Sequence, residues 1–139
     1  MGLILDSSVL IADERGKFDM QGFLLRFGFQ QPLITAITAS ELLHGVERAS
    51  DANRKQRRQR YVEHILTSLT VAPFDLLQAR CHARIWAELQ SRGSMIGVHD
   101  LQIAAAGIAL GHGVATLNVG EFQRVPGLVL VDATPFRNP

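Results

Sequence analysis

The chain has 139 residues, a length that suits one domain, and 47% of its residues are hydrophobic against 19% that are charged. This composition predicts a packed globule and excludes an intrinsically disordered protein. No apolar run approaches the length that crosses a bilayer, and residues 2–5 are too short for a signal peptide. The single cysteine, Cys81, excludes an internal disulfide. We therefore expect residues 1–139 to form one domain in a reducing, cytoplasmic setting without a membrane.

The net charge is only +1, but the charged residues are unevenly distributed. Between residues 53 and 60 the chain has no acid and five basic residues: Arg54, Lys55, Arg57, Arg58 and Arg60. Without these five, 9 basic side chains remain against 13 acidic ones, a balance of −4. The sequence therefore predicts a concentrated basic patch on a mildly acidic body.

Short apolar runs alternate with amphipathic segments along the chain. In chain order we expect a strand over 2–5, helices over 9–12 and 18–29, a strand over 33–37, helices over 38–46 and 54–69, a strand over 70–72, helices over 75–92 and 100–110, and strands over 114–117 and 128–131. Strands that alternate with helices are typical of an α/β domain. We expect about five strands in a mainly parallel sheet that is flanked by helices.

Two of the expected helices begin with capping signals. Ser7 or Ser8 is placed to cap the first helix. Thr38 and Glu41 match a capping box, in which the threonine caps the helix and the glutamate bonds back to the first residue. The helix after the second strand is therefore expected to begin at Thr38.

Four acidic residues lie where strands end or where helices begin, namely Asp6, Glu41, Asp100 and Glu121. In parallel α/β sheets, sites form beyond the carboxyl ends of the strands, so these acids are expected at one edge of the sheet. Carboxylates that lie close together repel one another unless a cation joins them, and Mg²⁺ prefers oxygen ligands. A bound divalent ion can activate water and stabilise the charge of a phosphodiester that is being cut. The pattern thus favours a metal-dependent nuclease.

Each acid also has a purely structural interpretation. Asp6 could cap the following helix, and Glu41 could complete the capping box with Thr38. Asp100 could stabilise a helix N-terminus through the helix dipole, and Glu121 could be a solvated loop acid. The residue pattern by itself leaves both interpretations open for every one of these acids.

Four segments resemble the conserved motifs of PIN domains. They are LILDSSVLI at 3–11, ITASELLHG at 37–45, IGVHDLQIAA at 96–105 and TLNVGEF at 116–122. These segments follow one another in the family's order over nearly the whole chain, and the closest subgroup is the VapC toxins of bacterial toxin–antitoxin pairs. The resemblance implies a PIN-like fold and an endoribonuclease that depends on Mg²⁺ or Mn²⁺.

The resemblance also implies roles for individual residues and partners. Asp6, Glu41 and Asp100 match the acids of the metal site, and Glu121 matches a fourth acidic position. Ser8, Thr116 and Asn118 match supporting polar positions. The family forms homodimers, and a VapB-type antitoxin that binds DNA holds it inactive. The RNA substrate stays open among tRNA, rRNA and mRNA, because specificity would depend on loop shape.

Two departures from the family pattern affect the expected metal site. The fourth acid is usually aspartate, whereas this chain has Glu121, and an acid often precedes the helical aspartate by two residues, where this chain has Val98. Both departures put a second tightly held metal in doubt. They leave open the alternative of a catalytically weak or inactive PIN-like module that binds RNA or protein.

The basic run and the histidines allow further alternatives. Positive charge at a helix start opposes the helix dipole, so residues 54–60 either contact RNA phosphates or form a solvated surface. A metal-independent ribonuclease would use histidine as acid and base. No pair among His44, His64, His82, His99 and His112 has the spacing of a zinc site. Only His99 adjoins a candidate acid, and we expect it to be a surface residue.

Overall fold

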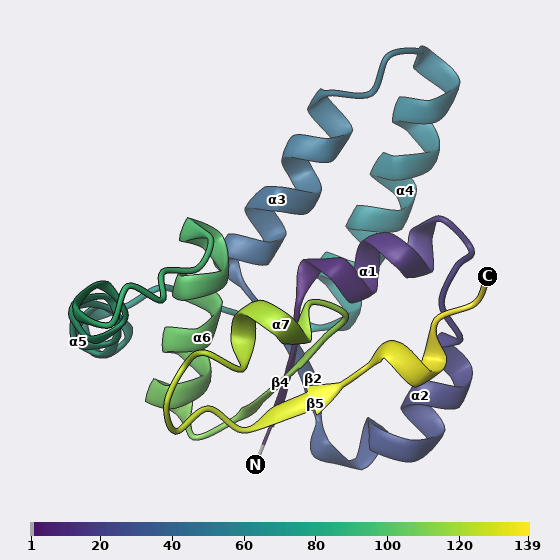
Figure 1. Ribbon diagram of the computed structural model, residues 1–139. Coiled ribbons are helices and arrows are strands. Elements are labelled where there is room, and N and C mark those ends of the chain that lie inside the picture. Colours follow the sequence, from purple (N-terminus) through teal and green to yellow (C-terminus); the bar gives the residue numbers. More distant parts are fainter. Residues whose placement is uncertain (1) are drawn as a thin grey trace.

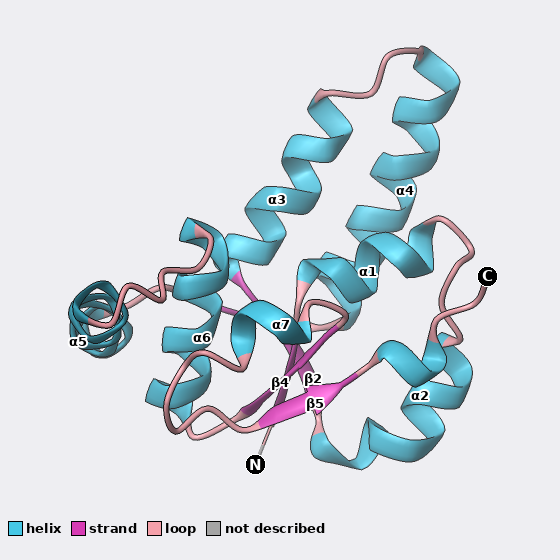
Figure 2. Cartoon of the chain, in the orientation of Figure 1, coloured by secondary structure: helices cyan, strands magenta, loops and turns pink. Residues whose placement is uncertain are grey.

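Five parallel strands form one sheet in the computed structural model, which describes residues 2–139. The strand order is β3-β2-β1-β4-β5. The strands are β1 (Leu3–Leu5), β2 (Pro32–Thr35), β3 (Thr70–Ala72), β4 (Gly113–Thr116) and β5 (Leu130–Asp132). The sheet is central in Figures 1 and 2, with helices on both of its faces. The predicted α/β fold with a parallel sheet is therefore confirmed.

Most of the remaining chain is helical (Figure 2). The helices are α1 (Ser7–Glu14), α2 (Met20–Phe27), α3 (Ala36–Glu47), α4 (Ala52–Ser68), α5 (Leu76–Ser91), α6 (Val98–Leu110) and α7 (Val119–Phe122), with short 3-10 turns at Gly28–Gln30 and Thr134–Phe136. Among residues 2–139, none of these helices is long and apolar enough to cross a membrane.

Two apolar cores lie on opposite faces of the sheet. Because side chains alternate along a strand, Leu3 and Leu5 of β1 face one core while Ile4 faces the other. The first core contains residues of α1 to α4, and the second contains residues of α5 to α7. In Figure 1, α1 and α2 lie on one side of the sheet and α5 and α6 on the other. β1 is thus buried on both faces and fixes the residue that follows it.

Helices α3 and α4 pack side by side and project from the sheet as a hairpin (Figure 1). The side chain of Asp51 caps α4 by accepting a hydrogen bond from the backbone N–H of Arg54 at 2.7 Å. Val62 and Ile65 are the buried residues of α4, whereas its first two turns carry the basic run. The basic run is therefore presented at the outer end of the hairpin.

Several predicted boundaries are wrong. β2 ends at Thr35 rather than at residue 37, and α3 begins at Ala36 rather than at Thr38. The side chain of Thr35 caps α3 by accepting from the N–H of Thr38 at 3.1 Å, so the expected capping box does not form. Ser7 and Ser8 lie inside α1 instead of capping it. The chain leaves the strand earlier than the apolar pattern indicates, and this frees Glu41 from any capping role.

β1 is also the switch point of the sheet. From β1 the chain adds β2 and β3 on one side and β4 and β5 on the other. In open α/β sheets, ligands bind beyond the carboxyl ends of the strands at such a point. Here the backbone N–H of Asp6 donates to the carbonyl of Ala115 at 2.9 Å, which ties the end of β1 to β4.

Gly107 allows α6 to pack closely on the sheet, and this makes a prediction about stability. A Cβ there would lie 2.9 Å from Leu128 Cδ1, 3.1 Å from Val114 Cγ2 and 3.2 Å from the carbonyl oxygen of His112. We expect Gly107→Ala to destabilise the fold by about 1–3 kcal/mol through overpacking, as measured by denaturant unfolding.

Gly45 in α3 provides the matched control for Gly107. A Cβ there meets no atom within 4 Å, so Gly45→Ala should stabilise the fold by up to about 1 kcal/mol through helix propensity. Equal effects of the two substitutions would contradict the close packing of α6.

Candidate functional site

Asp6 is the most buried of the candidate acids, with only 2% of its surface exposed. It follows β1 directly, and its side chain makes no capping bond to α1, so the capping interpretation is wrong. Its Oδ2 accepts from Ser8 Oγ at 2.6 Å and from Thr116 Oγ1 at 2.8 Å. Its Oδ1 is buried and has no hydrogen-bond partner in the described chain. One face of this carboxylate is therefore held by the protein, and the other is available to a ligand.

The hydroxyls of Ser8 and Thr116 are oriented toward Asp6 by backbone donors. Ser8 Oγ accepts from the N–H of Leu117 at 3.1 Å, and Thr116 Oγ1 accepts from the N–H of Asn118 at 2.8 Å. Each hydroxyl can then direct its own hydrogen at the carboxylate. Both hydroxyls thus hold the Asp6 carboxylate, and their role as supporting residues of a metal site stays a prediction.

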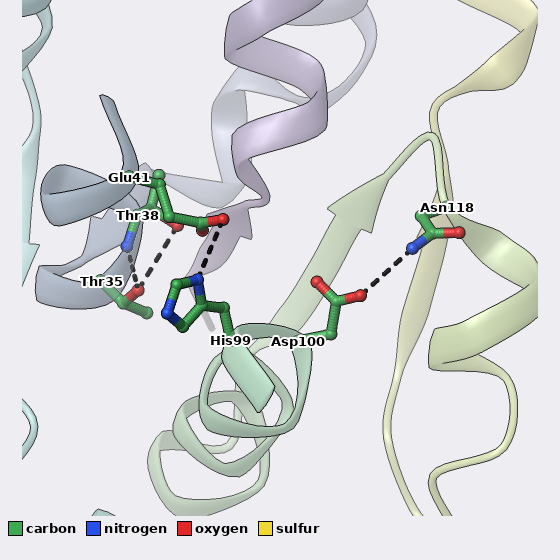
Figure 3. A network of polar contacts seen from close by, with 6 residues as sticks. All are labelled: Thr35, Thr38, Glu41, His99, Asp100 and Asn118. Carbon is green, nitrogen blue, oxygen red and sulfur yellow. Dashed lines mark hydrogen bonds and ion pairs between the residues drawn. The ribbon is translucent and has the colours of Figure 1, made fainter. Parts of the chain in front are cut away.

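Glu41 enters the site from α3, one turn and a half after the Thr35 cap. Its Oε2 lies 3.3 Å from Nδ1 of His99, which comes from the first turn of α6 (Figure 3). Its other oxygen, Oε1, is buried and has no hydrogen-bond partner among residues 2–139. His99 was expected to be a mere surface residue. It is exposed, but it also orients Glu41.

Asn118 joins the other two candidate acids. Its Nδ2 donates to Asp100 Oδ2 at 3.2 Å and to Glu121 Oε2 at 3.1 Å. Figure 3 places Asp100 between the Glu41–His99 pair and Asn118. Asp100 lies in the first turn of α6, and Glu121 lies in α7 just beyond β4. The structure therefore brings all four predicted acids to the carboxyl edge of the sheet.

Crowding of negative charge changes the acidity of this cluster. Burial first, then the contact with Glu121 and the charges of Asp6 and Glu41, raise the pKa of Asp100 from 3.8 to about 8. The contact with Asp100, followed by the Asn118 amide, lowers the pKa of Glu121. Asp100 is therefore the group that retains a proton when no cation is present.

These residues fit a hard divalent cation. The two orphaned oxygens, Asp6 Oδ1 and Glu41 Oε1, are buried atoms, although the Glu41 side chain as a whole is only partly buried, and an unpaired buried acceptor is costly unless a ligand completes it. Within residues 2–139, no three acidic, histidine or cysteine side chains converge closely enough to hold an ion by themselves. Mg²⁺ characteristically uses one or two carboxylates and keeps several waters, so the donor set suits that ion.

The predicted basic residues lie apart from the acids. Lys55 Nζ lies 3.8 Å from Glu47 Oε2, which links α4 to α3. Arg58 bonds to the carbonyl of Gly45 at 3.1 Å and lies 3.6 Å from Glu14. The hairpin therefore uses part of the basic run for its own packing, and none of its residues contacts the carboxylate cluster in the described chain.

The fold and these residues can now be compared with known proteins. The family model described as "PIN domain" matches residues 3–128. This chain belongs to the PIN-domain family. The expectation drawn from the four motifs is confirmed for the family and for its fold.

The relatives of this PIN domain include VapC proteins. A ribonuclease VapC from Rickettsia bellii is 37% identical over 128 residues, which are 92% of this chain and 93% of the relative. A tRNA(fMet)-specific endonuclease VapC from Salmonella typhimurium is 33% identical over 99 residues, covering 71% of this chain and 73% of the relative.

Solved structures resemble this PIN domain over almost their full length. VapBC2 from Rickettsia felis, bound to a DNA fragment from its promoter, matches with a TM-score of 0.86 and 25% identity, covering 94% of this chain and 98% of that chain. DNA-bound VapBC from Salmonella typhimurium matches with a TM-score of 0.85 and 27% identity, covering 95% of this chain and 98% of that chain. The resemblance to the VapC subgroup is therefore also confirmed.

The raised pKa of Asp100 predicts how stability depends on pH in the metal-free protein. The unfolded chain loses this proton near the ordinary value of 3.8, whereas the folded PIN domain keeps it up to about 8. Between these values the unfolded state binds fewer protons, so the free energy of unfolding falls as the pH rises. Thermal unfolding in EDTA, measured between about pH 4 and pH 8, should show that stability falls as the pH rises. The Asp100→Asn variant should show a smaller fall in stability over the same range. An identical pH dependence in both proteins would contradict the crowding of charge at Asp100.

Proposed function

We propose that this PIN domain is a metal-dependent endoribonuclease that hydrolyses RNA phosphodiester bonds with Mg²⁺ or Mn²⁺. One observation carries the proposal: the carboxylates of Asp6 and Glu41 each have a buried, unpaired oxygen near Asp100, whose pKa is raised by burial and by its acidic neighbours. Such a group of acids favours binding of a divalent cation. The names of the VapC relatives, which are ribonucleases, support the same activity.

Each site residue has a distinct role in the proposed mechanism. A divalent ion, when bound, supplies an activated water and offsets the charge that develops on the phosphate. Asp6 is a fixed ligand, because two hydroxyls hold its Oδ2 and leave Oδ1 available. Glu41 offers its Oε1 while His99 holds the opposite oxygen. Asp100 would be the third acid near the ion, with a pKa that a bound cation would lower, and Glu121 would add negative charge beside Asn118.

We also propose the biological setting. The related structures are VapBC complexes, which supports a VapB-type antitoxin as the partner of this chain. A homodimer and a cytoplasmic location follow from the VapC resemblance, and the substrate is a tRNA, an rRNA or an mRNA. The chain would then be the toxin of a toxin–antitoxin pair.

A second candidate function is a PIN domain that binds RNA or protein without cutting it. It is favoured by the absence, among residues 2–139, of three groups that hold an ion directly. It is also favoured by Val98 and Glu121, which replace more usual family residues. The activity test separates the two candidates.

The activity test is RNA cleavage by the purified, partner-free protein with Mg²⁺ or Mn²⁺, with and without EDTA. Cleavage should require the metal and should fall by at least about 100-fold in Asp100→Asn, because the site loses a ligand charge. Glu88→Gln is the control, since Glu88 lies on α5 and pairs with Arg92 outside the site. Cleavage that survives EDTA would indicate histidine chemistry, and no cleavage by folded protein would favour the binding module.

Thr116 tests the supporting contacts separately from the acids. Thr116→Val keeps the shape of the side chain but removes the hydroxyl that donates to Asp6. We expect Mg²⁺ or Mn²⁺ affinity to fall by about 10–100-fold, as measured by metal-dependent thermal stabilisation. Thr67→Val is the matched control, because that hydroxyl only bonds to carbonyls of its own helix. Equal metal affinity in the two variants would contradict the supporting role of Thr116.

A further inference from the structure

A pocket of about 530 Å³ lies beside the carboxylate cluster. Three basic residues line it, namely Arg15, Lys17 and Arg137, and no acid does. Ile11 and Leu117 contribute apolar surface to the same pocket. Such a combination of positive charges with an apolar wall suits a ligand that carries both anionic groups and flat apolar groups.

Backbone contacts bring Arg137 beside Arg15 and Lys17, although it lies more than a hundred residues further along the chain. Gly16, with a φ of +71°, turns the chain after α1, and the N–H of Lys17 donates to the carbonyl of Ala12 at 2.8 Å. The N–H of Asn138 donates to the carbonyl of Lys17 at 2.9 Å. Because backbone groups make these bonds, the basic side chains stay exposed and available.

The pocket is linked to the carboxylate cluster through two of its lining residues. Ser8 lines the pocket, and its hydroxyl donates to Asp6 at 2.6 Å. Leu117, which also lines the pocket, directly precedes the Asn118 that holds Asp100. A ligand in the pocket would therefore be one side chain away from the acids.

A second pocket of about 540 Å³ adjoins the first one through Arg15, which lines both. Arg54, Arg57 and Arg58 line this second pocket. Glu14 lines it too, but it lies 3.6 Å from Arg58 and so offsets that charge. The two pockets together form a basic path from the carboxylate cluster to the outer end of the α3–α4 hairpin.

Most cations of this path are not used by the fold itself. Among residues 2–139, ion pairs involve Lys55, Arg58, Arg92 and His99 as the positive partners. Five other cations of the path therefore have no acidic partner within ion-pair distance in the described chain: Arg15, Lys17, Arg54, Arg57 and Arg137. Five cations without an ion-pair partner along one path favour a polyanionic ligand, although Arg54 and Arg57 also act on the charge of Asp51.

We propose that the two pockets form an RNA subsite, in which Arg15, Lys17 and Arg137 hold backbone phosphates next to the scissile bond. Arg54 and Arg57 hold phosphates further along the same single strand. This proposal rests on the proposed ribonuclease function and names the surface that positions its substrate. It also selects two residues of the predicted basic run as RNA contacts, while Lys55 and Arg58 contribute to the hairpin.

Single-stranded RNA suits this path better than an acidic peptide does. The carboxylates repel any anion, so a strand that must enter their cluster needs cations directly beside it to remain bound. Phosphates occur at every nucleotide, which matches cations spread along a path rather than gathered at one point. The apolar wall at Ile11 and Leu117 provides a surface on which an unpaired base can rest.

The test is equilibrium binding of a fluorescent single-stranded oligouridylate in EDTA, where metal-dependent cleavage does not occur. Compared with the parent protein, the double variant Arg15→Gln/Arg137→Gln should bind at least about 10-fold more weakly. Its slope of log affinity against log salt should be smaller by about 1.4, at about 0.7 for each lost phosphate contact. Arg80→Gln is the control, because Arg80 is exposed on α5, which belongs to the opposite face of the sheet.

The outcomes separate this proposal from the proposed function. Weaker binding with a smaller salt slope supports the subsite, even if no RNA is cut. If the folded double variant binds the RNA with unchanged affinity and an unchanged salt slope, the subsite is overturned, even if the parent protein cuts RNA with Mg²⁺. Loss of binding to polyglutamate with unchanged RNA affinity would also overturn it and assign the path to an acidic peptide. Single variants of Arg15 and Arg137 provide the same readout if the double variant does not fold.

Discussion

Repulsion among the carboxylates at the carboxyl edge of the sheet is the constraint that the rest of this PIN domain accommodates. Burial and three acidic neighbours raise the pKa of Asp100, and hydrogen bonds from Ser8 and Thr116 to Asp6 relieve only part of the crowding. The crowded carboxylates thus lower stability at the place where the proposed cation would bind, a pattern common at functional sites. The surrounding structure has to hold these groups in place against their own repulsion.

The two apolar cores supply that rigidity. β1 is buried on both faces, and Asp6 follows it directly, so the most buried of the four acids is attached to a fully buried strand. Glu41 comes from a helix of one core, whereas Asp100 comes from a helix of the other. A site that is built from both layers is held by rigid elements rather than by loops, which favours accurate placement of its ligands.

The sequence indicated much of this arrangement because its signals are local. Asp6 ends an apolar run, and Asp100 opens a helix rich in alanine, so both acids could be placed at the edge of a parallel sheet. The start of α3 could not be fixed, because Thr35 and Thr38 are both good caps and only the tertiary course of β2 selects Thr35. The contact of His99 with Glu41 depends on how α6 packs beside α3, which no local pattern encodes. The sequence also did not show that Arg137 lies beside Arg15 and Lys17, because more than a hundred residues separate it from that pair.

The order of the elements along the chain has a consequence for when the site can exist. The residues that hold the first acids in position come from the last part of the sequence. Thr116 donates to Asp6, and Asn118 donates to both Asp100 and Glu121. A chain that is still being synthesised on the ribosome therefore carries its first acids without the groups that organise them. The contacts that organise the carboxylate cluster are complete only when β4 lies beside β1, so under the proposed function an unfinished chain lacks the organised site.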